Sequence, residues 1–250
     1  DELLSCLDPV GLLRYGRANR ENYRLVKDFL RREFILDNLL SPFITSEELP
    51  CFRKIHAGSQ FLISGSMALQ FFTHIQYPDS DLDLYIEEGR SHALILWLES
   101  IGYVEREDQS QAQSKEMVTD TGDVVGSPDY SDPCILKVAS YTRNSRQVQV
   151  ICTRNTPLQI ILDFPLTCVM NFITATTAYS LYPWATFESK IALEINTVNS
   201  ELEFNAKYAA RGWGIRQGIS RDDEKDRKSE FCLLDGDGFT RYVGDHRCWI

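Results

Sequence analysis

The sequence predicts an α/β fold of the α+β kind, in which a small mixed sheet has flanking helices and is followed by a helical C-terminal half. Three observations support this fold class. A buried strand, a glycine turn, a helix and a second strand follow one another over residues 60–86. A hairpin is expected around Asn144 and Ser145, and from Pro157 onward apolar residues recur at helical spacing. The presence of both strand-like and helix-like spacing of apolar residues indicates a mixed fold.

The same patterns divide the 250 residues into four segments. Helical spacing marks residues 1–50, and the mixed sheet is expected over residues 51–156. A helical subdomain is expected over residues 157–215, followed by a C-terminal loop and strand tail over residues 216–250. A polar stretch over residues 105–133, rich in Ser, Asp, Gln and Gly, is the longest expected loop.

Residues 60–75, QFLISGSMALQFFTHI, have the pattern of a buried strand that turns through Gly65 into an amphipathic helix. Ser66 is expected to cap that helix, because serine is a favoured N-cap residue. A helix N-terminus presents free backbone N–H groups and the positive end of the helix dipole, which together bind phosphate. We therefore expect Gly65 and Ser66 to contact the phosphates of a nucleotide.

Three aspartates follow this helix at every second position, at Asp79, Asp81 and Asp83. In an extended strand their carboxylates project from one face, and because like charges repel, this face requires a positive partner. Hard oxygen ligands suit Mg²⁺ or Mn²⁺, and Mg²⁺ typically takes one or two protein carboxylates together with water and substrate phosphate. Asp81 and Asp83 are therefore candidate metal ligands and catalytic residues. Taken alone, an aspartate run of this kind is also typical of a solvated strand edge.

Residues 64–87, SGSMALQFFTHIQYPDSDLDLYIE, resemble the nucleotidyltransferase superfamily of the DNA polymerase β type. The signature of that superfamily is a Gly-Gly or Gly-Ser turn, a helix, and a strand with two acidic residues separated by one position. Over residues 40–213 the chain also looks like a group of uncharacterised fungal nucleotidyltransferase-like proteins. The resemblance implies a small mixed nucleotidyltransferase-type sheet, ATP or another NTP as substrate, and Mg²⁺ or Mn²⁺ held by Asp81 and Asp83.

In that superfamily a third carboxylate from a later strand completes a two-metal site. The matching strand here is RQVQVICT, residues 146–153, and Gln149 stands where the acid is expected. An amide cannot act as a base and is a weaker metal ligand than a carboxylate. Asp163 is the nearest substitute and is a third catalytic candidate, although it is equally well interpreted as a helix-end charge that faces water.

The resemblance also implies a lysine from the helical half that contacts the phosphates. Lys190 and Lys207 are the candidates for this role, although each is also consistent with an ordinary surface lysine. Lys137 lies on the strand before Gln149 and could face the site. Arg211 follows Lys207 at i+4 and shares its helical face.

The chain is acidic, with a formal net charge of −10, which argues against a broad nucleic-acid-binding surface. The basic run over residues 14–34 has apolar residues at helical spacing and is interpreted as an amphipathic helix packed on the core rather than an RNA-binding arm. No apolar run reaches the roughly 18 residues needed to cross a bilayer, and the acidic start DELLSCLDPV is not typical of a secretory signal. Seven cysteines without a C-x-x-C pair, several of them within apolar runs, are interpreted as buried free thiols of a reducing compartment, which predicts a cytoplasmic or nuclear protein.

Two hypotheses of function follow. The first is a nucleotidyltransferase that binds an NTP with Mg²⁺ and transfers a nucleotidyl group, for example AMP, to a hydroxyl of an acceptor that is RNA, a protein or a small molecule. The second is a catalytically inactive nucleotide-binding or protein-interaction module with the same fold, and Gln149 favours it. The sequence therefore predicts a nucleotide site and leaves enzymatic turnover open.

Overall fold

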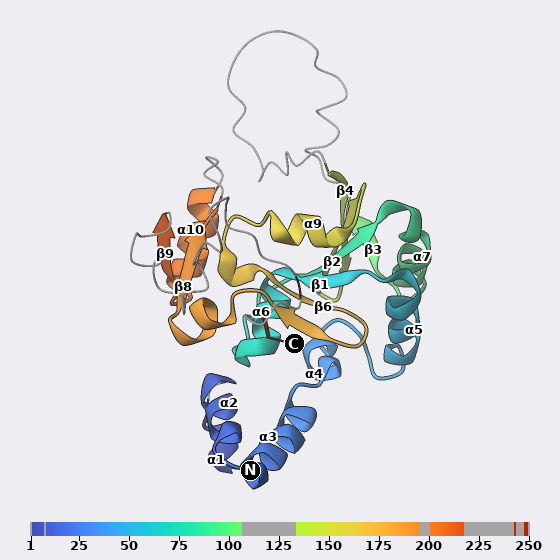
Figure 1. Cartoon of the computed structure of the whole chain (residues 1–250). Helices are drawn as coiled ribbons and strands as arrows, with labels where there is room; N and C mark the ends of the chain where they lie inside the picture. The colour runs from blue at the N-terminus through green and yellow to red at the C-terminus, as the bar shows by residue number, and fades with distance from the viewer. Residues whose placement is uncertain are drawn as a thin grey trace.

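The structure is a computed structural model of the whole chain, and it describes residues 2–7, 9–106, 134–195, 201–217, 243 and 248–249 (Figure 1). Most of the predicted loop over residues 105–133 and of the predicted tail over residues 216–250 lies outside the described residues. The described α-helices are α1 (Glu2–Ser5), α2 (Pro9–Arg17), α3 (Arg20–Glu33), α4 (Leu36–Leu40), α5 (Leu49–Ser59), α6 (Gly65–Thr73), α7 (His92–Ser100), α9 (Pro157–Leu162) and α10 (Glu201–Ala210). Shorter helical turns are η1 (Glu88–Arg90), η2 (Thr167–Val169) and η3 (Trp184–Glu188).

The described strands are β1 (Leu62–Ser64), β2 (Leu82–Glu87), β3 (Val104–Arg106), β4 (Ile135–Arg143), β5 (Arg146–Thr153), β6 (Asn171–Ile173), β7 (Ala178–Ser180), β8 (Ile191–Glu194) and β9 (Gly214–Gln217). Seven of them form one sheet in the order β3-β4-β5-β2-β1-β6-β7, while β8 and β9 pair in parallel as a separate ribbon. In the large sheet only β2 and β5 run parallel, and the other neighbours are antiparallel. The predicted mixed α/β architecture is confirmed at this level.

The hairpin between β4 and β5 turns at Asn144 and Ser145, as the sequence predicted. Both residues have positive φ, 50° and 64°. Two-residue hairpin turns of the primed types require this conformation, because their twist matches that of the flanking strands. The turn fixes the register that later places the glutamines of β5 beside β2.

The two faces of the sheet are covered by different helices. On one face, alternate residues of β2 and β5, among them Leu84 and Val150, pack with residues of the segments that contain α4, α5, α6 and α7. On the other face, Tyr85 and Ile151 pack with Ile160 of α9. Figure 1 shows α9 on the opposite side of the sheet from α4 and α6. Because strand residues alternate between faces, Asp83 lies on the same face of β2 as Tyr85, which is the α9 face.

The basic N-terminal run forms two helices rather than one. The break follows α2, and Asn19 caps α3 by accepting a hydrogen bond from the N–H of Asn22 at 2.8 Å. The apolar residues Leu12, Val26 and Phe29 of α2 and α3 pack mainly on one another in a small cluster of their own. The expectation that this run packs as one amphipathic helix on the core is therefore wrong, because the two helices bury their apolar faces against each other.

The predicted helical C-terminal half contains four strands. Strands β6 and β7 extend the main sheet from β1, and β8 and β9 form the second ribbon. Short apolar runs fit both a helix and a strand, and here pairing with β1 decides in favour of strands. The helix α10 is present, and its Tyr208 packs with Trp213, Leu69 and Phe72 in a second core cluster.

Within the part of the chain that the structure describes, no helix is long and apolar enough to cross a membrane. Six of the seven cysteines lie in this part, and none of them is bonded to another in a disulfide. Cys152 and Cys168 are buried as predicted, whereas the expectation of burial is wrong for Cys6 and Cys51, which are exposed. The seventh, Cys232, lies outside the described residues.

Candidate functional site

The turn from β1 into α6 is made by Gly65. Its φ of +66° lies in the left-handed region, which glycine adopts without steric cost. Ser64 is the N-cap residue, but its side chain does not cap the helix, and its Oγ donates a hydrogen bond to the carbonyl of Asn171 at 2.6 Å. The prediction that Ser66 is the N-cap is wrong, because the helix begins at Gly65 and Ser66 is buried in its first turn. The first N–H groups of α6 are therefore not used by a side-chain cap from Ser64.

The carboxylate of Asp83 reaches this turn from the neighbouring strand. Asp83 lies opposite Ser64 in the register of β1 and β2. A Cβ atom placed on Gly65 would collide with Oδ2 of Asp83. The glycine turn and Asp83 are thus in direct contact, and this contact depends on residue 65 having no side chain.

Asp81 lies directly before β2 and is half-buried, whereas Asp79 is exposed. Asp79 belongs to a turn in which the N–H of Ser80 donates to the carbonyl of Tyr77 at 3.0 Å. The prediction that three carboxylates line one strand face is wrong for Asp79, because it lies in this turn, whereas Asp81 directly precedes the strand. The acidic site is a pair.

Strand β5 adds two glutamines to the pair. Gln149 aligns with Asp83 in the parallel ladder, and its Nε2 lies 3.4 Å from Oδ2 of Asp81. The Nε2 of Gln147 donates to the same oxygen at 3.1 Å. The expectation that Gln149 lies beside the acidic pair is confirmed. Gln147 was not a candidate, and its position two residues before Gln149 on the same strand face is the signal that could have identified it.

Of the two candidate lysines, the structure brings Lys207 to the acidic pair. Lys207 lies on α10, and its positive charge lowers the pKa values of both Asp81 and Asp83 against the stronger effect of burial. Lys190 lies elsewhere, with Nζ 5.0 Å from the centroid of the Trp213 ring. Lys207 is thus the one of the two candidate lysines whose charge acts on both carboxylates.

The structure does not place Asp163 as a third metal ligand or Lys137 as a phosphate contact. Asp163 follows the last residue of α9 and is exposed, and it is not among the charges that shift the pKa values of Asp81 and Asp83. Lys137 is paired with Glu105, with Nζ 2.7 Å from Oε1. Among the residues that the structure describes, no group of three His, Cys, Asp or Glu side chains could hold a metal ion.

Burial dominates the electrostatics of the pair. Burial, together with the charge of Asp81 and against the opposing charge of Lys207, raises the pKa of Asp83 to about 7. Burial also raises the pKa of Asp81, against the effects of Lys207 and of the hydrogen bond from Gln147. The pKa of Lys207 is lowered by burial and by the charge of Arg211. The site therefore holds more negative charge than its lysine compensates, and a proton or a cation would relieve the excess.

The guanidinium group of Arg211 and the ring of Tyr77 form a cation–π contact next to this site. The guanidinium carbon of Arg211 lies 3.8 Å from the centroid of the Tyr77 ring. In the described part of the chain, Nη1 of Arg211 and the hydroxyl of Tyr77 are buried without a hydrogen-bond partner. The sequence placed Arg211 on the same helical face as Lys207, but no motif pointed to Tyr77. These two groups keep hydrogen-bonding capacity beside the positive charge of Lys207.

The donor set fits one Mg²⁺ ion better than two. Mg²⁺ typically takes one or two protein carboxylates and completes its shell with water and phosphate oxygens, and Asp81 and Asp83 would supply two carboxylates. The amide groups of Gln147 and Gln149 donate to Asp81. A second ion beside Gln149 would require that amide to turn its oxygen inward, and an amide oxygen contributes no charge.

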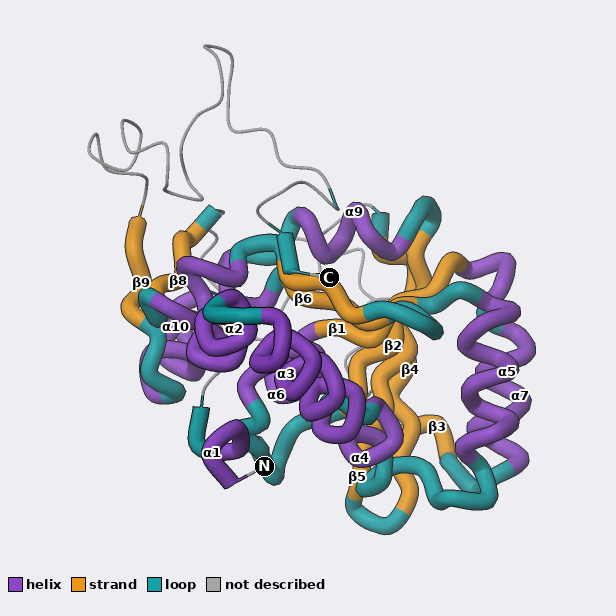
Figure 2. Tube along the Cα trace, turned by 60° about the horizontal axis from the view of Figure 1, so that its bottom comes forward, coloured by secondary structure: helices purple, strands orange, loops and turns teal. Residues whose placement is uncertain are grey.

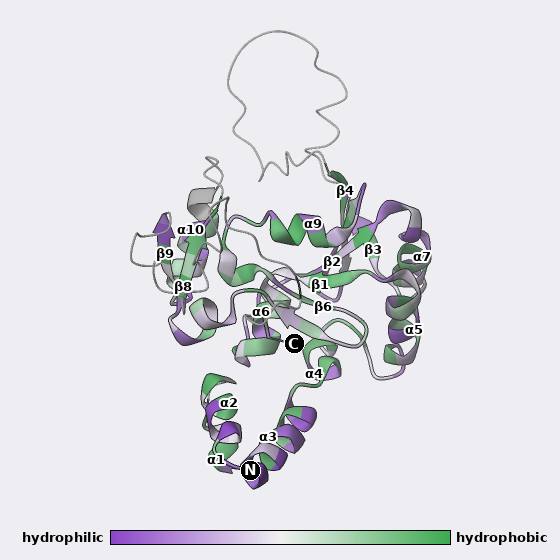
Figure 3. Cartoon of the chain, in the orientation of Figure 1, coloured by the Kyte–Doolittle hydropathy of each residue, from purple (hydrophilic) through white to green (hydrophobic). Residues whose placement is uncertain are grey.

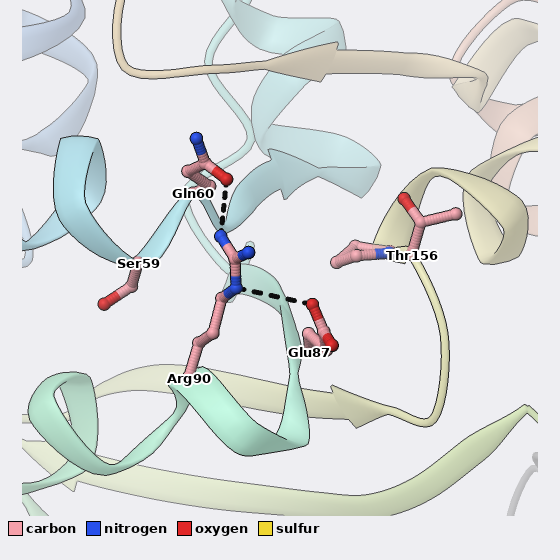
Figure 4. Close-up of a pocket in the computed structure, with 6 residues that line it drawn as sticks. Ser59, Gln60, Glu87, Arg90 and Thr156 are labelled. Atoms are coloured by element: carbon pink, nitrogen blue, oxygen red, sulfur yellow. Dashed lines mark hydrogen bonds and ion pairs between the residues drawn. The ribbon is translucent and has the colours of Figure 1, made fainter.

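A separate pocket of ≈ 280 Å³ lies at the other end of β2 (Figure 4). Its lining residues are Ser59, Gln60, Glu87, Arg90, Thr156 and Pro157. Arg90 donates to Gln60 and pairs with Glu87, with Nε 3.4 Å from Oε2. The charge in this pocket is already paired, and none of its lining residues belongs to the glycine turn or the acidic pair.

Comparisons with known proteins found no relative, because no family model, curated protein or solved structure matches the chain. The resemblance to nucleotidyltransferases of the DNA polymerase β type stays a prediction. The class that the structure defines is a mixed α/β protein with a seven-stranded, mostly antiparallel sheet and an acidic pair beside a strand-to-helix turn.

Proposed function

We propose that this protein binds a nucleoside triphosphate together with Mg²⁺ at the Gly65 turn, Asp81, Asp83 and Lys207. The observation that carries the proposal is the contact between Gly65 and the carboxylate of Asp83. It brings the N-terminus of α6, which favours phosphate, next to a carboxylate pair that favours a divalent cation. A metal-bound triphosphate would supply phosphate to the helix N-terminus and a divalent cation to the carboxylate pair.

Each group has a distinct part in this binding. The first N–H groups of α6 would donate to phosphate oxygens, and Asp81 and Asp83 would hold Mg²⁺, which neutralises phosphate charge when bound. Lys207 would supply a further positive charge to the phosphates from α10. Arg211, next to it, keeps a buried Nη1 that has no described partner and could donate to the same ligand.

Transfer of a nucleotidyl group is the second candidate function, and the intact Asp81 and Asp83 pair favours it. In this reaction a hydroxyl oxygen of the acceptor attacks the α-phosphorus, a new P–O bond forms, and pyrophosphate leaves. The acceptor class is RNA, a protein or a small molecule. Gln149 weighs against turnover, because its amide replaces a group that could hold a second metal or accept the hydroxyl proton. A nucleotide-binding protein without turnover is therefore the simpler form of the proposal.

Titration of ATP with and without Mg²⁺, followed by calorimetry, tests the binding. Asp81→Asn removes one ligand charge, and Asp79→Asn makes the same change at an exposed residue two positions earlier. We expect Asp81→Asn to weaken Mg²⁺-dependent ATP binding by about tenfold or more, equivalent to about 1.4 kcal/mol. Asp79→Asn should leave the affinity within about twofold, because its carboxylate does not contribute to the pair.

Equal affinities of wild type and both variants would place nucleotide binding elsewhere or exclude it. A pyrophosphate-release assay, run with Mg²⁺ or Mn²⁺ and each of the common NTPs, separates the two candidate functions. Release that disappears in Asp81→Asn supports transfer. Tight Mg²⁺-dependent binding without release supports the form without turnover.

A further inference from the structure

The outward face of α3 carries a continuous basic stripe. Its four members lie at spacings of i, i+4, i+7 and i+11, which places them on one side of the helix, and all are exposed. They are Arg20, Arg24, Lys27 and Arg31. Eleven residue steps at 1.5 Å give the stripe a length of about 16 Å. Figure 2 shows α3 at the front of the molecule beside α2.

These four side chains form few ion pairs with the rest of the described chain. In the described part of the chain, no ion pair joins Arg20, Arg24 or Lys27 to an acidic side chain, and Arg31 has one long contact of 3.9 Å to the exposed Asp28. Like charges at i and i+4 destabilise a helix by roughly 0.2–0.5 kcal/mol per pair. The chain as a whole is strongly acidic, so solubility does not require a basic stripe. A polyanionic partner would neutralise this repulsion.

An exposed aromatic ring lies beside the stripe. Tyr23 is 58% exposed, and Nζ of Lys27 lies 6.0 Å from its ring centroid. Cations that follow a phosphate backbone, together with an aromatic face for an unpaired base, are the usual components of single-strand recognition. Figure 3 shows hydrophilic segments along α3 interrupted by hydrophobic ones.

The other side of α3 argues against an anionic membrane as the partner. A membrane-bound amphipathic helix buries its apolar face in lipid. In α3 that face is occupied, because Val26 and Phe29 are buried in the cluster with Leu12 of α2. Tyr23 and Leu25 are the large apolar side chains that α3 leaves exposed, and two isolated residues do not make an apolar face that could insert into lipid. The rest of the exposed surface of α3 is polar and largely basic, and it suits phosphate groups rather than acyl chains.

We propose that the outward face of α3 binds the phosphate backbone of single-stranded RNA, with Tyr23 stacking on an unpaired base. RNA is preferred over DNA because loops and bulges of folded RNA present unpaired bases that stack on aromatic side chains such as Tyr23. The proposal goes beyond nucleotide binding at the Gly65 turn and does not depend on it. It also revises the view from net charge alone, because a local stripe can bind a polyanion on an acidic protein.

Fluorescence anisotropy with the full chain and a labelled oligo(U) of about 15 nucleotides tests the proposal without nucleotide or Mg²⁺ present. The test variant is the triple change Arg20→Glu, Arg24→Glu and Lys27→Glu. The matched control carries the same charge change at exposed residues elsewhere, Lys54→Glu, Arg106→Glu and Arg154→Glu. We expect the stripe variant to lose about tenfold or more in affinity, and its log-log salt slope to fall by about 2, as for three lost phosphate contacts.

The control should keep its affinity for oligo(U) within about threefold of the wild type, because it has the same net charge as the stripe variant but keeps the stripe intact. A neutral triple variant, Arg20→Gln, Arg24→Gln and Lys27→Gln, repeats the test without charge reversal, and circular dichroism verifies that each variant is folded. Parallel titrations use oligo(dT) and phosphatidylserine vesicles.

Three outcomes would overturn the proposal: no binding of oligo(U) by the wild type at low salt, equal losses in the stripe and control variants, or tighter binding to oligo(dT) or the vesicles than to oligo(U). ATP binding by the stripe variant is measured in parallel and should match the wild type. Failure of RNA binding is therefore distinguishable from failure of nucleotide binding.

Discussion

Gly65 and Asp83 are in such close contact that any side chain on residue 65 would collide with Oδ2 of the carboxylate. Gly65 also has a positive φ, which a residue with a Cβ adopts only at a steric cost. The geometry of the turn and the position of the acidic residue are therefore set together. A substitution at either residue should therefore alter the conformation of the other.

Gly65→Ala is expected to lower the free energy of unfolding by about 1–3 kcal/mol and to abolish measurable ATP binding. The added methyl group displaces Asp83 and strains the turn at the same time. Urea unfolding and ATP titration measure the two effects. Gly58→Ala is the matched control, because a Cβ there meets nothing within 4 Å and Gly58 lies inside α5. We expect it to be neutral or stabilising by roughly 0.5–1 kcal/mol. Equal behaviour of the two variants would remove the turn from the site.

Asp83 should make the stability of the metal-free protein fall between about pH 4 and pH 7. Its pKa in the folded protein is raised to about 7, so over this range the folded state keeps a proton that the unfolded state has released. The free energy of unfolding then falls as pH rises, by at most about 1.4 kcal/mol per pH unit, and levels off above pH 7. Asp83→Asn removes this dependence and should be more stable than the wild type at pH 8.

Thermal unfolding at pH 5, 6, 7 and 8 measures this dependence for both proteins. Added Mg²⁺ should stabilise the wild type more at pH 8 than at pH 6, because the ion and the proton compete for the same carboxylates. In Asp83→Asn the effect of Mg²⁺ should be small at either pH. A wild-type profile identical to that of Asp83→Asn would show that Asp83 titrates normally.

Gln149→Glu would add a third carboxylate beside Asp81. Without metal, the new charge should lower stability by about 1–2 kcal/mol through repulsion, and with Mg²⁺ the loss should be recovered or exceeded. If the fold retains the rest of a transfer site, pyrophosphate release should rise above that of the wild type. Gln76→Glu adds the same charge at an exposed position and is expected to change none of these quantities by more than about 0.5 kcal/mol. Unchanged Mg²⁺ stabilisation in Gln149→Glu would argue against a metal at the pair.

The local elements around the site were predictable because their signals are short-range. The glycine turn at Gly65, the strand after Asp81 and the hairpin at Asn144 follow from turn chemistry and period-two alternation. The position of Gln149 beside the pair was expected from the resemblance to nucleotidyltransferases rather than from a local pattern. The turn, strand and hairpin signals need little information beyond about ten neighbouring residues.

The features that were missed depend on distant parts of the chain. Strand β6 was assigned to a helix, and only its pairing with β1 makes it a strand. Ser66 has a good capping sequence, but Gly65 already adopts the first helical position, so Ser66 falls inside the helix. The placement of Lys207 rather than Lys190 at the pair depends on how α10 packs on α6, which no local pattern encodes.

Arg143 ties the β4 end of the hairpin to the segment between α4 and α5, and this gives the last prediction. Its Nη1 and Nη2 bond the two carboxylate oxygens of Glu48 at 2.6 and 2.9 Å. The same nitrogens donate to the carbonyls of Ile101 and Phe43, and the side chain of Arg143 is only 16% exposed. A lysine cannot reproduce this planar set of donors.

Arg143→Lys is therefore expected to lower the free energy of unfolding by about 2–4 kcal/mol, since it leaves carbonyls and part of Glu48 without donors. The hydrogen bonds from Arg143 are the main cause of the lowered pKa of Glu48, so the wild type gains stability from this pair above the usual Glu pKa and loses it in acid. The difference between wild type and Arg143→Lys should then narrow below about pH 4. Urea unfolding at pH 7 and pH 3.5 measures it, and Arg154→Lys, at an exposed position, should stay within about 0.5 kcal/mol of the wild type. A loss in Arg143→Lys no larger than in Arg154→Lys would mean that the network contributes nothing to stability.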